Sequence, residues 1–311
     1  MKKKFCVIGV NGQDGKYLSE IIIKSKNKVL GIGRQTRSKY FKNSKYFNYK
    51  NLDLENSKEL DILLRKFKPD YIVNFAAMHG SSEKKWNNDL EKSIKINTIP
   101  TKIILDYISN KNLNCFYFFA SSMRCLKQEQ NISERSKRIN QDFYQITKNL
   151  SEILINDYRK KFNIKASVCW FFQHESKIRK KDFFIPKIVN ILKKSINDKR
   201  YYKKVDNLDF YCDWGCAEEY MNIVIKLILK KINQDFVIGT GNTLKGSIFV
   251  KELFKKYNLN FKNHVGVKNK KKILIRKYRA DISKLKKILR IYPVKNIYNV
   301  CDDMLMSNNK R

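Results

Sequence analysis

The first apolar run of the chain leads directly into a glycine-rich loop, and this junction constrains the fold more than any other stretch. Residues 4–10 are largely apolar, and the sequence GVNGQDG then places three glycines within seven positions. Leu18, Ile21 and Ile22 follow at helical spacing. A strand, a glycine loop and a helix in this order allow backbone amides to approach a diphosphate at the start of the helix. The GxxGxxG spacing differs from the GxGxxG of ordinary dehydrogenases, and a tight turn without a ligand is the alternative.

Strand-like and helix-like segments alternate from this loop onward. The pattern predicts strands over residues 28–33, 70–76, 114–120, 165–172 and 234–241, with helices over 58–67, 101–110 and 143–162. Repeated units of this size predict an α/β fold, namely a Rossmann-type doubly wound parallel sheet with right-handed crossovers. We expect residues 1–172 plus 208–241 to form the dinucleotide-binding domain. Residues 173–207 plus 242–311 are expected to form a smaller α/β substrate-binding lobe.

Composition excludes several classes of protein. The 311 residues carry a formal net charge of +37, but the lysines are scattered and accompanied by many Asn and Ile residues, so we interpret most of the charge as solvated surface and expect no nucleic-acid partner. Apolar runs are too short to predict membrane insertion. The seven cysteines lie mostly in apolar runs without a CxxC pair, which favours buried, reduced thiols, no metal site and a cytoplasmic protein.

Arg34, Asp53 and Leu54 follow the second predicted strand and bear on cofactor binding. Arg34 stands where an NAD site would place an acidic residue for the ribose hydroxyls. An arginine there suits a 2′-phosphate, so we expect NADP. Asp53 and Leu54 follow a short polar strand at the depth expected for adenine, although such an Asp is equally well explained as a helix cap.

The stretch DFYQITKNLSE supplies a candidate acid/base. Tyr144 and Lys148 are four residues apart at the start of a predicted helix, so both point to one side. A lysine ammonium beside a tyrosine hydroxyl stabilises the phenolate, and we therefore expect the pKa of Tyr144 to fall toward neutrality. Ser122, at the end of the preceding strand, can hydrogen-bond the same substrate oxygen. YxxxK alone occurs often by chance, but its position at the start of this helix favours the functional interpretation.

With these motifs in place, the chain resembles the extended short-chain dehydrogenase/reductases (the NAD-dependent epimerase/dehydratase family), and within them the GDP-mannose 4,6-dehydratases. GVNGQDGKYLSE is similar to the family's GxTGQDGSYLAE, FFQHES to LFNHES, YCDWGCAEEY to LRDWGHAKDY, and QDFVIGTG to EDFVIATG. The resemblance runs nearly from end to end. It implies a lyase of nucleotide-sugar metabolism with tightly held NADP, a nucleotide-sugar substrate such as GDP-mannose, and assembly as a homodimer or homotetramer.

The resemblance also implies roles for individual residues. Ser122, Tyr144 and Lys148 would be catalytic, with the tyrosine removing the proton of the sugar 4-hydroxyl while a hydride leaves C4. The residues implied to bind the cofactor are Gly9, Gly12, Gln13, Asp14, Gly15, Arg34, Asp53, Leu54, Phe75, Ala76, Ala77, Met78, His79, Lys148, His174 and Arg179.

The chain departs from the family pattern at two functional positions. Arg124 occupies the place of the glutamate that removes the C5 proton during elimination, and an arginine cannot serve as that base. Cys212 replaces the arginine that grips the diphosphate. The nucleotide-binding arginine of the family's tail stays unassigned among Lys271, Arg276 and Arg279. Three functions therefore remain open. Overall similarity favours a GDP-mannose 4,6-dehydratase-like lyase with another base, and the alternatives are a nucleotide-sugar 4-ketoreductase or epimerase and a binding protein with impaired catalysis.

Overall fold

The computed structural model describes residues 2–79, 89–268 and 277–307. Its centre is a parallel sheet of seven strands in the order β12-β7-β5-β4-β1-β2-β3. The strands are β1 (Lys4–Ile8), β2 (Lys28–Gly33), β3 (Phe47–Asn51), β4 (Tyr71–Asn74), β5 (Phe116–Ser122), β7 (Lys165–Phe171) and β12 (Phe236–Ile238). The predicted doubly wound α/β fold is confirmed. The order reverses beside β1, so the glycine loop after β1 lies at the switch point where such sheets bind ligands.

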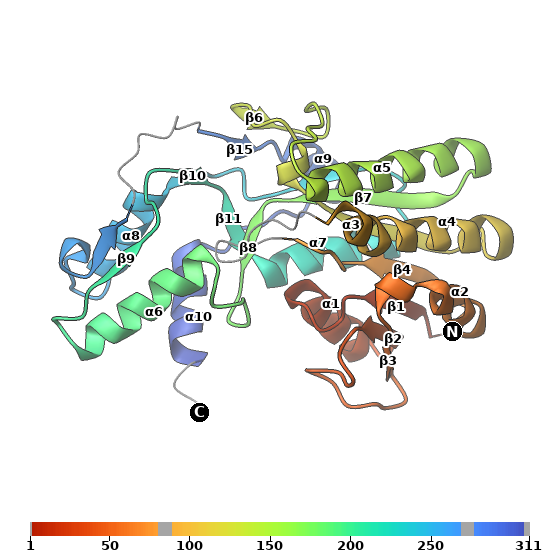
Figure 1. The fold of residues 1–311 in the computed structure, drawn as a ribbon, viewed down its shortest axis with the longest axis horizontal. Coiled ribbons are helices and arrows are strands. Elements are labelled where there is room, and N and C mark those ends of the chain that lie inside the picture. The colour runs from red at the N-terminus through yellow and green to blue at the C-terminus, as the bar shows by residue number, and fades with distance from the viewer. Residues whose placement is uncertain (1, 80–88, 269–276, 308–311) are drawn as a thin grey trace.

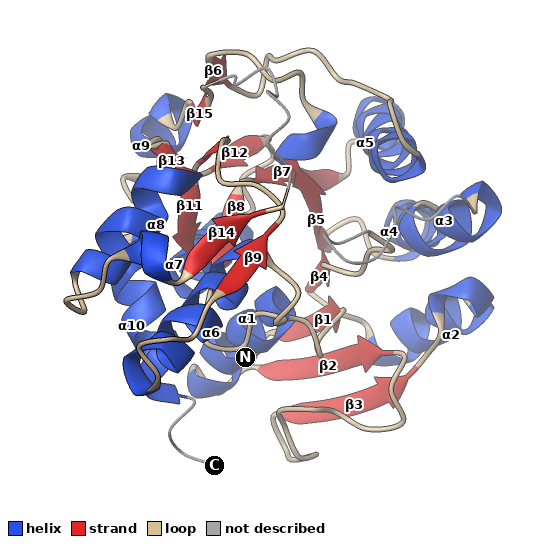
Figure 2. Cartoon of the chain, turned by 60° about the vertical axis from the view of Figure 1, so that its left-hand side comes forward, coloured by secondary structure: helices blue, strands red, loops and turns tan. Residues whose placement is uncertain are grey.

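Helices cover both faces of the sheet (Figure 2). One face carries α2 (Lys58–Phe67), α3 (Leu90–Asn97), α4 (Ile99–Lys111) and α5 (Phe143–Phe162). The other carries α1 (Gln13–Lys24), α7 (Ala217–Leu229) and α9 (Ser283–Leu289). The strands read as nearly continuous apolar runs because both faces are buried. Phe116, Phe118 and Phe119 of β5, for example, have no exposed surface.

A second, smaller hydrophobic core lies beside the carboxyl ends of the strands (Figure 1). Its helices are α6 (Phe184–Asn197), α8 (Gly246–Lys255) and α10 (Ile297–Ser307). Its paired strands are β9 (Lys203–Val205) with β14 (Val265–Val267), and β10 (Tyr211–Cys212) with β13 (Leu244–Lys245). Trp214 stacks on Phe184 and packs at a tilt against Phe249 in this core.

Short strand pairs and turns complete the fold. They are β6 (Asn131–Ile132) with β15 (Arg279–Ala280), β8 (Gln173–Glu175) with β11 (Trp214–Cys216), and the 3₁₀ turns η1 (Leu54–Asn56), η2 (Met123–Cys125) and η3 (Phe261–Asn263). In the described part of the chain, no helix has the length and apolar character needed to cross a bilayer. All seven cysteines are buried free thiols, as expected.

Candidate active site

The glycine loop joins β1 to α1, and its three glycines serve different purposes. Gly9 has a φ of +85°, and a Cβ there would lie 2.9 Å from the backbone nitrogen of Ala76. At Gly15 a Cβ would lie 2.4 Å from the carbonyl oxygen of Gly9, so this glycine permits contact between helix and loop. A Cβ at Gly12 would meet only that same oxygen, at 3.2 Å. Because Gly12 lies where α1 begins, its open side fits a phosphate facing the first-turn N–H groups.

The loop that carries Arg34 lies against the glycine loop. Asn11 Nδ2 donates to Gln35 Oε1 at 2.8 Å, and the Lys39 backbone N–H donates to Asn11 Oδ1 at 2.8 Å. Arg34 is exposed at the end of β2. Arg34 therefore belongs to the loop that contacts the glycine loop, and its contact with a 2′-phosphate stays a prediction.

The remaining residues on the cofactor side fall into two groups. Asp53 caps η1 by accepting a hydrogen bond from the Glu55 N–H at 3.1 Å. This is the helix-cap role that the sequence left open as an alternative to a contact with adenine. Leu54 is buried. The segment from Phe75 to His79 follows β4 and is partly exposed. Asn97, which sequence reasoning missed, fixes this segment by accepting from the Met78 N–H at 2.7 Å and donating to Thr147 Oγ1 at 3.0 Å. The sequence carries no signal for this role, because α3 (LEKSIKIN) is largely polar and an asparagine there reads as a surface residue.

Gln13, Asp14 and His174 form a polar cluster that ties α1 to β8. His174 Nε2 lies 2.9 Å from Asp14 Oδ1 and Nδ1 lies 2.7 Å from the Phe172 carbonyl oxygen. Burial disfavours the charged forms, but the mutual attraction outweighs it, raising the pKa of His174 and lowering that of Asp14. Gln13 Nε2 donates to the His174 carbonyl at 3.1 Å. With their side chains engaged in this way, Gln13 and Asp14 have only backbone N–H groups to offer a phosphate.

Arg179 lies next to this cluster. Its Nε is 3.5 Å from Glu175 Oε2, and its guanidinium stacks over the Phe183 ring at 3.6 Å from the ring centroid. Arg179 also lowers the pKa of Asp14 through its charge. His174 and Arg179 thus lie close together beside α1, on the side of the glycine loop that faces the smaller core.

Ser122 and Tyr144 are brought together at the carboxyl end of β5. Tyr144 lies in the first turn of α5, and the Ser122 side chain is close enough to its hydroxyl to lower its pKa. Lys148, one turn further along α5, is buried, and its ammonium donates to the Ala120 carbonyl at 2.8 Å. All three predicted catalytic residues therefore lie around the end of one strand.

The expected fall of the Tyr144 pKa toward neutrality is wrong for the protein by itself. Burial raises the pKa of Tyr144, and the nearby Cys125 adds to the rise, whereas Ser122 and Arg124 oppose it. Lys148 is directed at a backbone carbonyl and lies 4.5 Å from the centroid of the Phe119 ring. Burial also lowers the pKa of Lys148 itself, to about 8. The cation that favours the phenolate in this structure is Arg124.

Arg124 is held by an acidic partner. Its Nη2 lies 2.8 Å from Asp142 Oδ2, and Asp142 caps α5 by accepting from the Gln145 N–H at 2.8 Å. At the second departure from the family pattern, Cys212 is buried and interacts with the hydroxyl of Tyr278. The position where the family places a diphosphate-binding arginine is therefore occupied by a buried thiol that carries no positive charge.

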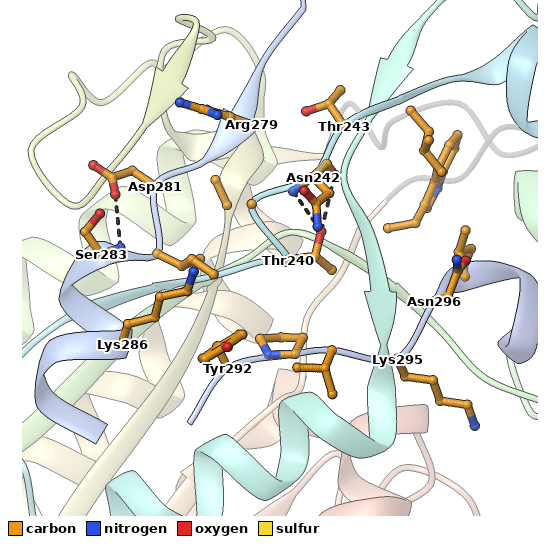
Figure 3. Close-up of a pocket in the computed structure, with 18 of the residues that line it drawn as sticks. Thr240, Asn242, Thr243, Arg279, Asp281, Ser283, Lys286, Tyr292, Lys295 and Asn296 are labelled. Atoms are coloured by element: carbon orange, nitrogen blue, oxygen red, sulfur yellow. Dashed lines mark hydrogen bonds between the residues drawn. The ribbon is translucent and has the colours of Figure 1, made fainter. Parts of the chain in front are cut away.

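A cavity of about 990 Å³ lies elsewhere, between β15, β11 and the segment that joins α9 to α10 (Figure 3). Arg279 lines it and donates from Nε to Asn131 Oδ1 at 2.7 Å. Lys271 and Arg276, the other candidates for the nucleotide-binding cation, lie outside the described residues. Neither the glycine loop nor the catalytic residues line this cavity, so its size does not identify it as the active site.

Comparison with known proteins accounts for this arrangement. The profile of the family described as GDP-mannose 4,6 dehydratase matches residues 6–303. A GDP-mannose 4,6 dehydratase of Drosophila melanogaster is 28% identical over 80% of this chain and 67% of its own length. One from Vibrio cholerae is 26% identical over 78% of this chain and 68% of its own.

Solved structures agree in fold. UDP-glucuronic acid 4-epimerase from Bacillus cereus, in complex with NAD, superposes with a TM-score of 0.79 at 19% identity, covering 97% of this chain and 95% of that one. dTDP-glucose 4,6-dehydratase from Bacillus anthracis, also in complex with NAD, has a TM-score of 0.81 at 15% identity, covering 99% and 97%. The match over nearly the whole chain, together with the glycine loop and the Ser122, Tyr144 and Lys148 cluster, shows that the chain belongs to the GDP-mannose 4,6-dehydratase family.

Proposed function

We propose that this protein binds NADP and a nucleotide sugar and catalyses hydride transfer at a sugar carbinol carbon, as a nucleotide-sugar 4-ketoreductase or epimerase. The observation that carries the proposal is that the side chains of Tyr144 and Ser122 lie close together at the end of β5, with Lys148 one turn further along α5. The glycine loop follows β1, and only β4 lies between β1 and β5 in the sheet. A dinucleotide along this edge therefore passes from the loop to the catalytic tyrosine.

The chemistry divides between the cofactor and the chain. Bound NADP would accept or supply the hydride. The ionised form of Tyr144 would take the proton of the sugar hydroxyl as the carbon–hydrogen electron pair leaves as hydride, so the carbon–oxygen single bond becomes a ketone. Ser122 donates a hydrogen bond to the same oxygen, and the reverse reaction returns the proton from Tyr144. Epimerisation requires hydride return to the opposite face of that ketone.

Complete dehydration is the second candidate, and the family match favours it. That reaction needs a base for the C5 proton, and Arg124, which stands at the expected position, is ion-paired with Asp142 and holds its protons. The relatives named as GDP-mannose 4,6-dehydratases suggest GDP-mannose as the first substrate to test. Cys212 supplies no positive charge at the position where the family binds the diphosphate with an arginine. Because substrate binding therefore differs from that of the family, other nucleotide sugars should be tested beside GDP-mannose.

The experiment is incubation of the purified protein with NADP or NADPH and a panel of sugar nucleotides and their 4-keto forms, with mass detection. A keto-sugar that gains the mass of two hydrogen atoms identifies a ketoreductase, and an unchanged mass with altered configuration identifies an epimerase. Loss of the mass of water identifies a dehydratase and refutes the preferred proposal. Tyr144→Phe is the matched control, because it removes the proton acceptor and keeps the ring. Undiminished turnover in that variant would refute the assigned role of Tyr144.

A further inference from the structure

The turn that follows β5 orients Ser122. In η2 the Ser122 side chain caps the turn and accepts from the backbone N–H of Arg124 at 3.3 Å. The hydroxyl that faces Tyr144 is therefore tied directly to the main chain of Arg124. Any movement of Arg124 relative to α5 would change the spacing between the two catalytic oxygens.

Arg124 is fastened to α5 at two points. Its guanidinium contacts Asp142, the residue that caps the helix, at 2.8 Å. Its carbonyl oxygen accepts from Gln145 Nε2 at 2.8 Å, and the backbone N–H of Gln145 donates to the other carboxylate oxygen of Asp142, also at 2.8 Å. These contacts close a ring that joins η2 to the first turn of α5, where Tyr144 lies.

The same ring determines the charge beside Tyr144. The described groups that act electrostatically on its hydroxyl include Cys125, Arg124 and Asp142. Burial raises the pKa of Cys125 to about 11, so this thiol is neutral at physiological pH. Lys148 is the other nearby cation, but it is directed at the Ala120 carbonyl. Arg124 and Asp142 are thus an opposed pair of charges, one favouring and one disfavouring the phenolate.

We propose that Arg124, held by Asp142, is a positioning residue for proton transfer: it fixes Ser122 against Tyr144 and supplies the positive charge that favours ionised Tyr144. This inference rests on the proposed function and deepens it. It gives the arginine a role in the carbinol chemistry at the position where elimination would need a base. The side chains of Arg124 and Asp142 are 33% and 22% exposed, which is enough burial for the charges to act on the neighbouring phenol.

The first test measures whether the contacts between Arg124 and Asp142 couple η2 to the first turn of α5. Arg124→Gln, Asp142→Asn and the double variant are compared with the wild type by thermal unfolding without ligands. Asn caps a helix about as well as Asp, so Asp142→Asn removes the charge and keeps the cap. If the ion pair joins η2 to α5, the double variant loses little more thermal stability than either single variant. Additive losses would overturn the proposal, whether or not the protein turns over any sugar.

The second test measures the effect on Tyr144. Proteins labelled with ¹³Cζ-tyrosine are titrated by NMR, and the Tyr144 resonance is assigned by its absence in Tyr144→Phe. Arg124→Gln is expected to raise the pH at which Tyr144 ionises and Asp142→Asn to lower it, each by about half a unit. Arg124→Lys, which keeps the charge, should titrate close to the wild type.

Shifts of opposite sign are the decisive result, because a purely structural role would move both variants in the same direction or neither. Two shifts of the same sign would overturn the proposal. If Tyr144 does not ionise before the onset of alkaline unfolding, the comparison of the single and double variants by thermal unfolding decides it. Both readouts are independent of turnover. A wild-type protein that converts no sugar nucleotide would refute the proposed function, and the titration would still decide the role of Arg124.

Discussion

Lys148→Met is expected to stabilise the protein while abolishing hydride transfer. Lys148 is almost fully buried in α5, where its ammonium contacts the Ala120 carbonyl and the Phe119 ring. Burial lowers its pKa from 10.5 to about 8, which corresponds to about 3 kcal/mol of cost for holding the charged form in the folded protein near neutral pH. Methionine keeps most of the length and the apolar stem without the charge.

The net gain in the free energy of unfolding is smaller than about 3 kcal/mol, because the Lys148→Met substitution also removes a hydrogen bond. Leaving the Ala120 carbonyl without the ammonium costs about 1–2 kcal/mol. The variant should therefore be more stable than the wild type by about 1–2 kcal/mol near neutral pH. The activity is lost because Lys148 belongs to the catalytic cluster, so stability and function change in opposite directions.

The pH dependence gives a sharper test. The folded-state pKa of Lys148 lies below its unfolded value, so the folded wild type binds fewer protons and gains stability as pH rises from about 8 toward about 10.5. The advantage of Lys148→Met should thus shrink by about 2 kcal/mol between about pH 7 and about pH 9.5.

The measurement is urea unfolding of both proteins at the two pH values, with Lys160→Met as a control. Lys160 is an exposed lysine of the same helix, so its substitution should change stability by less than about 0.5 kcal/mol at either pH. A Lys148→Met protein that is less stable than the wild type near neutral pH, or a stability difference that does not vary with pH, would refute the reasoning.

Three further outcomes follow from the cofactor side. Arg34→Ala should weaken NADP binding at least about tenfold and leave NAD binding nearly unchanged in calorimetric titrations. Equal losses of affinity for NADP and NAD would show that Arg34 does not bind the 2′-phosphate. Gly15→Ala should lower stability by about 1–3 kcal/mol because its Cβ would lie 2.4 Å from a carbonyl oxygen, whereas Gly12→Ala should cost far less; similar melting temperatures would contradict this. The His174 and Asp14 ion pair raises the pKa of His174, so its stabilisation is present below about pH 6.5 and is lost as pH rises through the folded pKa. The stability advantage of wild type over His174→Gln should therefore decrease between about pH 6 and about pH 9, and an advantage that grows in this range would refute the ion pair.

Local patterns were sufficient for most elements of the sheet. The predicted helices over residues 58–67 and 143–162 match α2 and α5, and the predicted strand over 28–33 matches β2. These segments are long or strongly periodic, so their own residues specify them. After residue 173 the sequence predicted β12 within residues 234–241. The other described strands there have only two or three residues each, and they form because distant segments supply their partners, as β8 does for β11. Such pairings have no local signature.

Some features of the candidate site could likewise be predicted from the sequence, and others depend on tertiary structure. The sequence by itself determined the glycine loop, the spacing of Tyr144 and Lys148, and the family, because these depend on residue type and on neighbours along the chain. Tertiary structure alone decided the electrostatics: the ammonium of Lys148 is directed at a carbonyl, and Arg124, 20 positions before Tyr144, is the cation that acts on it. Electrostatic interactions depend on distance and burial in space, and these are fixed only when β5, η2 and α5 pack together.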